Sequence, residues 1–482
     1  MESEPVYDCN KEVAYLREYL QIESQHPYPD YGHCVDFLMK QSILIGIPLN
    51  IYYPSNKENP LVILTWEGLM PDLPSILLNS HMDVVPVYPD KWSYAPFGAE
   101  MDKEGNIYAR GSQNMKSVGM QYLAAVRYLK NNGAVFKRTI HLSFVPDSEM
   151  GGRFGMRLFA ATPEFRALNI GFALDEGMPS PTEEIPVFYG ERNVWRMLFK
   201  FVGTSGHGSF LLKNTVGEKF YKLLSFIMAI REDSIEQLKN NPDLTLGDVM
   251  SINMTRAHAG VQCNVIPPNM IACFDFRLPV EIDHKEFENR IKQFCEDAGG
   301  DIEFEYEYKV PKISPTVADD SNPYWACFKA AIDELGLKIK PQIHYAATDS
   351  RYLRALGISA LGFTPLNNTT LRFHDNDEFV PAKVFLKGID IYVKLLTDLA
   401  NLPEIIEEVK EEEKEGEKEE EEEEEKEIIK EELVPEMKAE VKEMKEEVKE
   451  EVKEEVKEEE KEEAKEEMKE EVKEEVKEEV KE

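Results

Sequence analysis

Three apolar segments of the chain each run directly into a cluster of polar residues, and this pattern restricts the fold more than any other feature. The segments "SILLNSH", "TIHLSFV" and "IGFALD" have the length and apolar content of buried strands. They lead to His81 with Asp83, to Ser148 with Glu149, and to Glu176. A long predicted helix separates the first two segments. Strands that alternate with helices and end in polar residues are typical of an α/β sheet with its functional site along one edge.

The middle of the chain follows a different pattern, which predicts a compact α+β module inserted into the α/β domain. After residue 310 the α/β alternation returns and ends in a predicted helix near 382–399. We therefore expect a discontinuous α/β domain over 1–190 and 311–402, with an α+β domain over 191–310. The predicted strands and helices of the inserted domain cover 194–203, 217–240, 248–260, 264–279, 284–298 and 302–310.

The end of the chain, residues 403–482, is a low-complexity segment rich in glutamate and lysine. From Glu404 onward it holds 41 Glu and 17 Lys, and "VKEE" repeats follow from Val448. In a helix such a four-residue repeat drifts by about 40° at each step, so no lasting apolar stripe forms. We expect a solvated tail, either coiled coil or disordered. A specific acidic docking tail is the alternative.

The charge of the chain argues against nucleic acid and anionic membranes as partners, and its cysteine content indicates a reducing compartment. The chain has a net charge of -36, and acidic residues are in excess outside the tail as well, which argues against binding to nucleic acid or to an anionic membrane. No apolar run reaches the roughly 18 residues that a membrane span needs. The six cysteines form no C-x-x-C pair, and the first residues contain no apolar signal core. These features predict reduced thiols and a cytoplasmic location.

Several polar residues fall where a predicted strand or turn meets a loop. H-x-D is common by itself, and a lone histidine at a strand end is more often an ordinary polar residue. The number of such positions gives the pattern its weight, because a two-metal hydrolase site needs imidazole and carboxylate ligands for each ion and a carboxylate that bridges them. The residues are His81, Asn114, Glu149, Glu176 and His374.

The order of motifs closely resembles the aminoacylase-1 family, in the zinc aminoacylase/carboxypeptidase clan. The resemblance extends from about residue 10 to about residue 400 and implies a zinc-peptidase-like catalytic domain with a lid that also forms a dimer. It implies a cytosolic homodimer with two zinc ions per subunit, which hydrolyses N-acyl-L-amino acids to an amino acid and a carboxylate. The motifs include "SILLNSHMDVVPV", "IYARGSQNMK", "TIHLSFVPDSEMGG", "GFALDEG", "GTSGHGS", "FDFR", "AATDSRY" and "HDNDE".

The resemblance also implies the roles of individual residues. His81 and Glu176 would hold one zinc ion, Glu149 and His374 would hold the other, and Asp83 would orient the ring of His81. All five residue types are present at the positions that the family pattern requires.

Three further residues of the inserted domain would act on the substrate. The resemblance implies that His207 reaches into the site of the partner subunit to stabilise the oxyanion, while Asn264 and Arg277 position the substrate. A guanidinium group suits the carboxylate of an acylated amino acid because it can bind both oxygens. The alternatives are that Arg277 pairs with a surface acid and that His207 caps a turn.

Two residues depart from the family pattern at the positions most important for the chemistry. "GSQNMK" places Asn114 where the family has the aspartate that bridges both zinc ions. Asparagine has one carbonyl oxygen, no charge, and an NH₂ group that can only donate. "PDSE" places Ser148 where the family has the glutamate that acts as general base. Losing a positioned base costs about 10² to 10⁴ in rate. We therefore expect weak or single zinc occupancy and little or no hydrolysis.

Two readings of the function follow. In the first, the chain is a pseudoenzyme that binds an N-acyl-L-amino acid or a similar small molecule, as a homodimer or in a mixed dimer with an active paralogue. In the second, it is an active zinc amidohydrolase with residual or altered single-metal turnover. The residues implied in binding survive while those implied in the chemistry do not, which favours the first. A nucleophilic role for Ser148 is disfavoured because "PDSEMGG" is not a G-x-S-x-G elbow.

Overall fold

The computed structural model describes residues 9–404 of the chain. The predicted tail over 403–482 therefore lies outside the described residues from residue 405 onward, and so do residues 1–8. No helix within 9–404 is long and apolar enough to cross a membrane.

A mixed eight-stranded sheet forms the centre of the α/β part. Its strands lie in the order β1-β2-β6-β3-β7-β16-β8-β15. β3 runs parallel to both β6 and β7, so the carboxyl ends of these three neighbours lie at one edge of the sheet. This edge carries the polar clusters that follow the three strands. The strands are β1 (Leu49–Tyr52), β2 (Leu61–Trp66), β3 (Ser75–His81), β6 (Ile140–Val145), β7 (Ile170–Asp175), β8 (Glu184–Glu191), β15 (Lys338–His344) and β16 (Ser359–Phe363).

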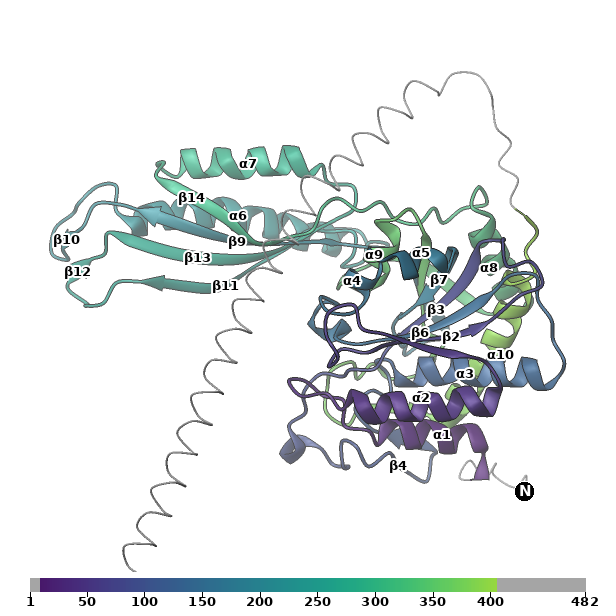
Figure 1. The fold of residues 1–482 in the computed structure, drawn as a ribbon. Coiled ribbons are helices and arrows are strands. Elements are labelled where there is room, and N and C mark those ends of the chain that lie inside the picture. Colours follow the sequence, from purple (N-terminus) through teal and green to yellow (C-terminus); the bar gives the residue numbers. More distant parts are fainter. Residues whose placement is uncertain (1–8, 405–482) are drawn as a thin grey trace, which may run out of the picture. The chain divides into compact units, whose positions relative to one another are not determined.

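Helices cover both faces of this sheet (Figure 1). Side chains alternate between the faces along each strand, so Leu64 and Leu78 belong to one apolar core while Ile63 and Leu77 belong to the other. The larger core lies under α1 (Lys11–Leu20), α2 (Tyr31–Ile45), α3 (Lys116–Asn131), α8 (Pro323–Glu334) and α10 (Ala382–Leu399). The smaller one lies under α4 (Met156–Phe159), α5 (Pro163–Ala167) and α9 (Ser350–Arg354).

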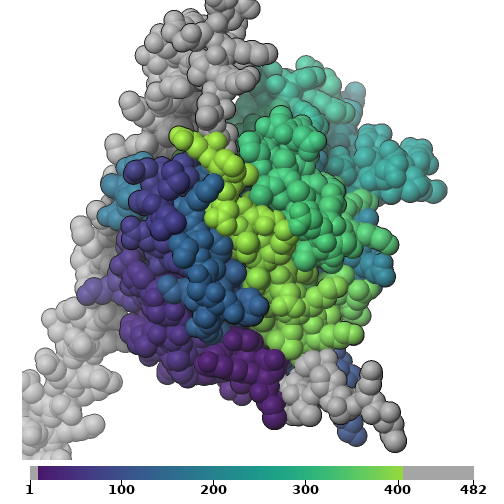
Figure 2. Space-filling view, turned by 90° about the vertical axis from the view of Figure 1, so that its right-hand side faces the viewer, coloured from purple at the N-terminus to yellow at the C-terminus, as the bar shows by residue number. Residues whose placement is uncertain are grey.

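α10 closes the larger core late in the sequence. It packs against both α3 and α8. In Figure 2 its surface appears as a yellow-green band between blue and green segments. α3 in turn approaches the sheet closely at Gly119, where an added Cβ would lie 2.6 Å from the hydroxyl oxygen of Ser80. This close approach fixes the start of α3, and the turn that precedes it, beside the end of β3.

A separate antiparallel sheet forms the second part, with strands in the order β11-β13-β9-β14. Two helices pack on it around a core that contains Trp195, Phe199 and Phe274. A two-stranded ribbon of β10 and β12 lies at the far end of this part in Figure 1. The elements are β9 (Asn193–Val202), β10 (Gly206–His207), α6 (Val216–Asn240), β11 (Ser251–Ala259), β12 (Val265–Ile266), β13 (Asn269–Leu278), α7 (His284–Asp297) and β14 (Ile302–Lys309).

The predicted fold class, an α/β sheet with a separate antiparallel α+β part, is confirmed. The single strand expected over 264–279 divides into β12 and β13. Pro267 and Pro268 stand between the two, and neither can donate to a strand ladder. The exact domain boundaries stay predictions.

A small three-stranded sheet brings two distant loops to the site. It contains β4 (Glu100–Met101), β5 (Asn106–Tyr108) and β17 (Phe379–Pro381). β5 pairs with β17, with Tyr108 opposite Phe379. The turn after β5 carries Asn114 and the loop before β17 carries His374, so this pairing places the two side by side.

Candidate active site

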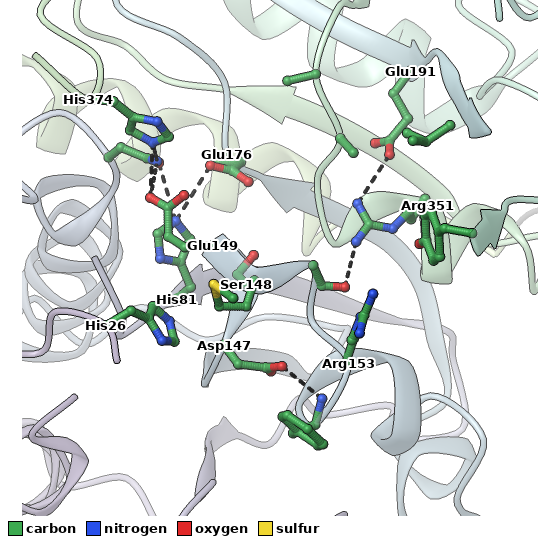
Figure 3. Close-up of a pocket in the computed structure, with 18 of the residues that line it drawn as sticks. His26, His81, Asp147, Ser148, Glu149, Arg153, Glu176, Glu191, Arg351 and His374 are labelled. Carbon is green, nitrogen blue, oxygen red and sulfur yellow. Dashed lines mark hydrogen bonds and ion pairs between the residues drawn. The ribbon is translucent and has the colours of Figure 1, made fainter. Parts of the chain in front are cut away.

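A cavity of about 1250 Å³ lies at the carboxyl ends of β3, β6 and β7. Residues of β9, β13 and β14 in the second part line its other side, among them Arg196, Arg277 and Tyr308. Figure 3 shows side chains of the α/β part that line the cavity. The predicted site residues that line it are His81, Asn114, Ser148, Glu149, Glu176, Arg277 and His374.

Two histidine–glutamate pairs face each other in this cavity, with an amide between them. His81 Nε2 lies 3.6 Å from Glu176 Oε2, and His374 Nε2 lies 3.1 Å from Glu149 Oε1 (Figure 3). Asn114 Oδ1 lies 3.2 Å from His81 Nε2. Its Nδ2 donates to Glu149 Oε1 at 2.7 Å and lies 3.2 Å from His374 Nε2. The five residues named from the sequence are therefore brought together.

The two sides of this cluster offer a metal ion different sets of donor atoms. On the side of His81 and Glu176, the imidazole nitrogen, the carboxylate and the carbonyl oxygen of Asn114 are all atoms that can ligate zinc. The Glu149–His374 pair instead faces the NH₂ group, which has no lone pair to offer. If the side-chain amide of Asn114 were rotated by 180°, its NH₂ group would face His81 and its carbonyl oxygen would face the Glu149–His374 pair. Within residues 9–404, no three His, Cys, Asp or Glu side chains form a group that could hold a metal ion.

Asp83 anchors the turn that carries Ser148 and Glu149. Its buried carboxylate accepts the backbone N–H groups of Ser148 at 3.1 Å and Glu149 at 2.9 Å, and it contacts His26 Nε2 at 2.8 Å. The orientation of His81 by this carboxylate stays a prediction. His81 Nδ1 lies 2.8 Å from the backbone carbonyl of Asp83 but 3.5 Å from Oδ1, because the carboxylate is turned toward the loop and His26.

Electrostatics keep this anchor charged. Burial alone would raise the pKa of Asp83, but hydrogen bonds from His26 and His81 outweigh burial and lower that pKa well below its usual value. Burial opposes protonation of His26, yet the hydrogen bond to Asp83 raises the pKa of His26 above its usual value. The ion pair between His26 and Asp83 therefore holds the turn at the floor of the site.

Ser148 stands at the entrance to a short 3₁₀ turn (Ser148–Met150) after β6. The side chain of Asp349, which also interacts with that of Ser148, is almost completely buried. Burial raises the pKa of Asp349 well above its usual value. Burial thus disfavours the charged form of Asp349 that could act as a base for the hydroxyl group of Ser148.

Sequence reasoning missed two residues that build the site. Glu378 is fully buried, and its carboxylate accepts the backbone N–H groups of Gln113 at 2.6 Å and Asn114 at 3.2 Å. It also pairs with Arg110 Nη1 at 2.6 Å. The run of acids in "HDNDE" was the available signal for Glu378. His26 offered no signal, because its only distinguishing neighbours are prolines.

Arg277 lines the cavity and is already paired with an acid. Its Nε donates to Asp275 Oδ1 at 2.6 Å and its Nη2 to Oδ2 at 3.2 Å. This ion pair matches the alternative stated for Arg277, although Asp275 is largely buried and not a surface acid. The pair holds the guanidinium in a fixed position beside the cavity.

His207 and Asn264 lie away from this cavity. His207 belongs to β10 and pairs with Val265 of β12, so Asn264 is next to it on the ribbon. Both side chains are exposed, and neither lines the cavity. His207 Nδ1 bonds to the hydroxyl of Ser209 at 2.8 Å. One copy of the described chain therefore does not bring them to the metal-ligand cluster.

Comparison with known proteins agrees with this geometry. The model of peptidase family M20/M25/M40 matches residues 77–398, a span that includes the carboxyl ends of β3, β6 and β7. The chain belongs to this family. Mouse aminoacylase-1 is 46% identical over 82% of this chain and 96% of its own length. Aminoacylase-1 of Dictyostelium discoideum is 40% identical over 82% of this chain and 98% of its own.

Solved structures share the fold of this M20 family member. A metallo-carboxypeptidase of the M20 family from Sulfolobus solfataricus aligns with a TM-score of 0.61 at 18% identity, over 81% of this chain and 99% of its own. A dinuclear metal-binding M20 peptidase from Bacillus subtilis aligns at 0.60 with 15% identity, over 82% and 98% of the two chains. The fold is thus that of the M20 family, and the aminoacylase-1 homology predicted from the motifs is confirmed.

Proposed function

We propose that this M20 family chain binds N-acyl-L-amino acids in the cavity and hydrolyses them slowly or not at all. The homology to aminoacylase-1 supports the ligand class. The position of Asn114 supports the loss of activity, because it stands between the two histidine–glutamate pairs. The cytoplasm is the proposed location, which the absence of disulfide bonds among the cysteines of residues 9–404 supports.

Metal binding is the first step that the residues of this chain impair. Two dications about 3.5 to 4 Å apart need an anion between them to offset their repulsion. Asn114 supplies none, and its NH₂ group faces the second pair. We therefore propose that the site takes one zinc ion, or binds zinc weakly, through His81, Glu176 and the carbonyl oxygen of Asn114. Zinc bound there would lower the pKa of a coordinated water.

Proton transfer is the second impaired step. A hydrolase must take a proton from the attacking water and return it to the leaving amine. Ser148 occupies the position that the family pattern gives to the base, and its hydroxyl group does not accept a proton near neutral pH. Glu149, the acid that follows Ser148, accepts a hydrogen bond from Asn114 and contacts His374.

Substrate binding residues are retained, and we propose that a second subunit completes them. Arg277, held by Asp275, presents its guanidinium group to the cavity. His207 and Asn264 lie exposed on the ribbon of β10 and β12, so they would reach the cavity of another subunit, either of the same chain or of an active paralogue. Sedimentation of the purified chain should then show a dimer, and a monomer at micromolar concentration would contradict this step.

Residual single-metal hydrolysis is the second candidate function. The observation that favours it is the intact three-donor set around His81, which fits one ion. In this case the enzyme would need no base at position 148, because hydroxide from solvent could attack the substrate directly. Its rate of hydrolysis would rise with pH, since the hydroxide concentration rises.

Hydrolysis of N-acetyl-L-methionine tests the proposal. The wild-type chain should be nearly inactive with zinc present, and Asn114→Asp combined with Ser148→Glu should raise turnover by about 10² or more, the range expected for restoring a base. Turnover by the wild type at a rate that the double substitution leaves unchanged would overturn it. Asp36→Glu, at an exposed position of α2 outside the cavity, is a control for handling and folding.

A further inference from the structure

The end of the cavity opposite the histidine–glutamate pairs is strongly cationic. Glu191 faces Arg351 at 3.7 Å but is shared with Arg354 at 3.3 Å, and Asp275 is shared between two guanidinium groups. Figure 3 shows Arg351 and Arg153 away from His374, on the other side of the cavity. The arginines that line the cavity are Arg153, Arg192, Arg196, Arg277 and Arg351.

Two of these arginines show that positive charge is in excess here. Among residues 9–404, the guanidinium of Arg192 has only backbone carbonyls as hydrogen-bond partners, those of Val249 at 3.1 Å and Tyr345 at 2.7 Å. Burial, followed by repulsion from Arg277, lowers the pKa of Arg192 to about 10. Arg351 is 4% exposed, and its Nε has no hydrogen-bond partner among the described residues. The described residues therefore leave part of the positive charge at this end of the cavity unpaired.

Arg153 is the guanidinium group best placed to take a ligand anion. It follows Gly151 and Gly152 on the loop after β6 and is exposed to the cavity. Its guanidinium lies 5.9 Å from the centre of the Tyr308 ring, and Arg196 lies 5.6 Å from the same ring. No carboxylate within residues 9–404 forms an ion pair with Arg153. The two arginines beside Tyr308 thus form a second cationic group, which Asp275 links to Arg277 through its ion pair with Arg196.

We propose that the cavity selects N-acyl-L-amino acids with an acidic side chain, such as N-acyl-glutamate, and this rests on the proposed binding of N-acyl-amino acids. The α-carboxylate would pair with Arg277, and the side-chain carboxylate would pair with Arg153 and Arg196. A guanidinium group suits a carboxylate because it donates two parallel hydrogen bonds. Asn114 and Ser148 favour such a dianion, because neither adds a negative charge to the opposite end of the cavity.

Calorimetric titration of the full chain tests this selectivity with three ligands. N-acetyl-L-glutamate should bind about ten-fold more tightly than N-acetyl-L-glutamine, which has the same shape and keeps the α-carboxylate, and more tightly than N-acetyl-L-methionine. Arg153→Gln should remove most of the difference between the first two ligands. Arg166→Gln removes the same charge from an exposed position on α5 outside the cavity and should leave the difference intact.

The outcomes separate this inference from the proposed function. Equal binding of N-acetyl-L-glutamate and N-acetyl-L-glutamine would overturn the selectivity and leave the proposed function in place. A preference for glutamate that Arg153→Gln does not change would overturn the assignment to Arg153. Failure of all three ligands to bind would overturn both. Raising NaCl from about 0.05 M to about 0.5 M should weaken the binding of the glutamate derivative most, because it carries the extra charge.

Discussion

The side-chain nitrogen of Asn114 donates a hydrogen bond of 2.7 Å to Oε1 of Glu149. A donor thus occupies the place between the two histidine–glutamate pairs, where two metal ions would need an anion. Glu378 and Asp83 position the ligand side chains from behind, because they bind the backbone N–H groups of the turns that carry them.

Glu378 positions the turn of Asn114, so removing its charge should destabilise the protein and disorder the site. Glu378→Gln leaves Arg110 buried without its anion and replaces an acceptor of the Gln113 and Asn114 N–H groups with an amide. We expect a loss of about 3 kcal/mol in the free energy of unfolding, as for other broken buried pairs. Urea denaturation measures it. Glu183→Gln, in an exposed ion pair, is the matched control and should cost less than about 1 kcal/mol.

Asp83→Asn should loosen the turn that carries Ser148 and Glu149. The asparagine amide has only one acceptor oxygen. One of the two backbone N–H groups, or His26, therefore loses its hydrogen-bond acceptor. We expect a loss of about 2 to 3 kcal/mol in the free energy of unfolding and a fall in the pKa of His26, followed by NMR. Asp30→Asn, at an exposed helix cap, serves as control. A variant as stable as wild type with the His26 pKa unchanged would show that Asp83 does not anchor the turn.

Acid should destabilise the protein through the buried side chain of His141. This histidine is buried, with Nδ1 2.9 Å from the Thr65 hydroxyl and Nε2 donating to the Leu168 carbonyl at 3.1 Å. Burial lowers the pKa of His141 from 6.5 to about 4. The unfolded chain therefore binds the proton first, and stability that is complete above pH 6.5 is lost as pH falls toward about 4, by about 2 to 3 kcal/mol.

Denaturation of His141→Gln at a series of pH values checks the last prediction. The amide can keep both hydrogen bonds but does not titrate, so the variant should lose less stability than wild type between pH 7 and about 4.5. An unchanged pH slope would contradict the assignment to His141.

The sequence predicted the parts of the fold whose apolar patterns are strong. The helix expected near 382–399 is α10 (Ala382–Leu399), and β3, β6 and β7 end where their apolar runs end. β8 and β15 were not predicted. β15, "KIKPQIH", is a polar edge strand with a proline, and its pairing with β8 depends on tertiary contacts that leave no local signal.

The candidate site also contains residues that the sequence predicts and residues that it does not. Ligand residues at strand ends could be named because the parallel strands β6, β3 and β7 bring their ends together. Residues that support the site could not. Glu378 accepts hydrogen bonds from backbone N–H groups more than 260 positions away in the sequence. The hydrogen bond between His81 and the backbone carbonyl of Asp83 depends on the conformation of a local turn. Such choices are made by three-dimensional contacts and have no periodicity in the sequence.

Zinc stoichiometry tests the central claim most directly. The purified full-length chain and Asn114→Asp should be dialysed against the same micromolar zinc solution, and bound metal should be counted by mass spectrometry alongside protein. The account predicts at most one ion per wild-type chain, held through His81 and Glu176, and two ions per Asn114→Asp chain. Two tightly held ions in the wild type would contradict it.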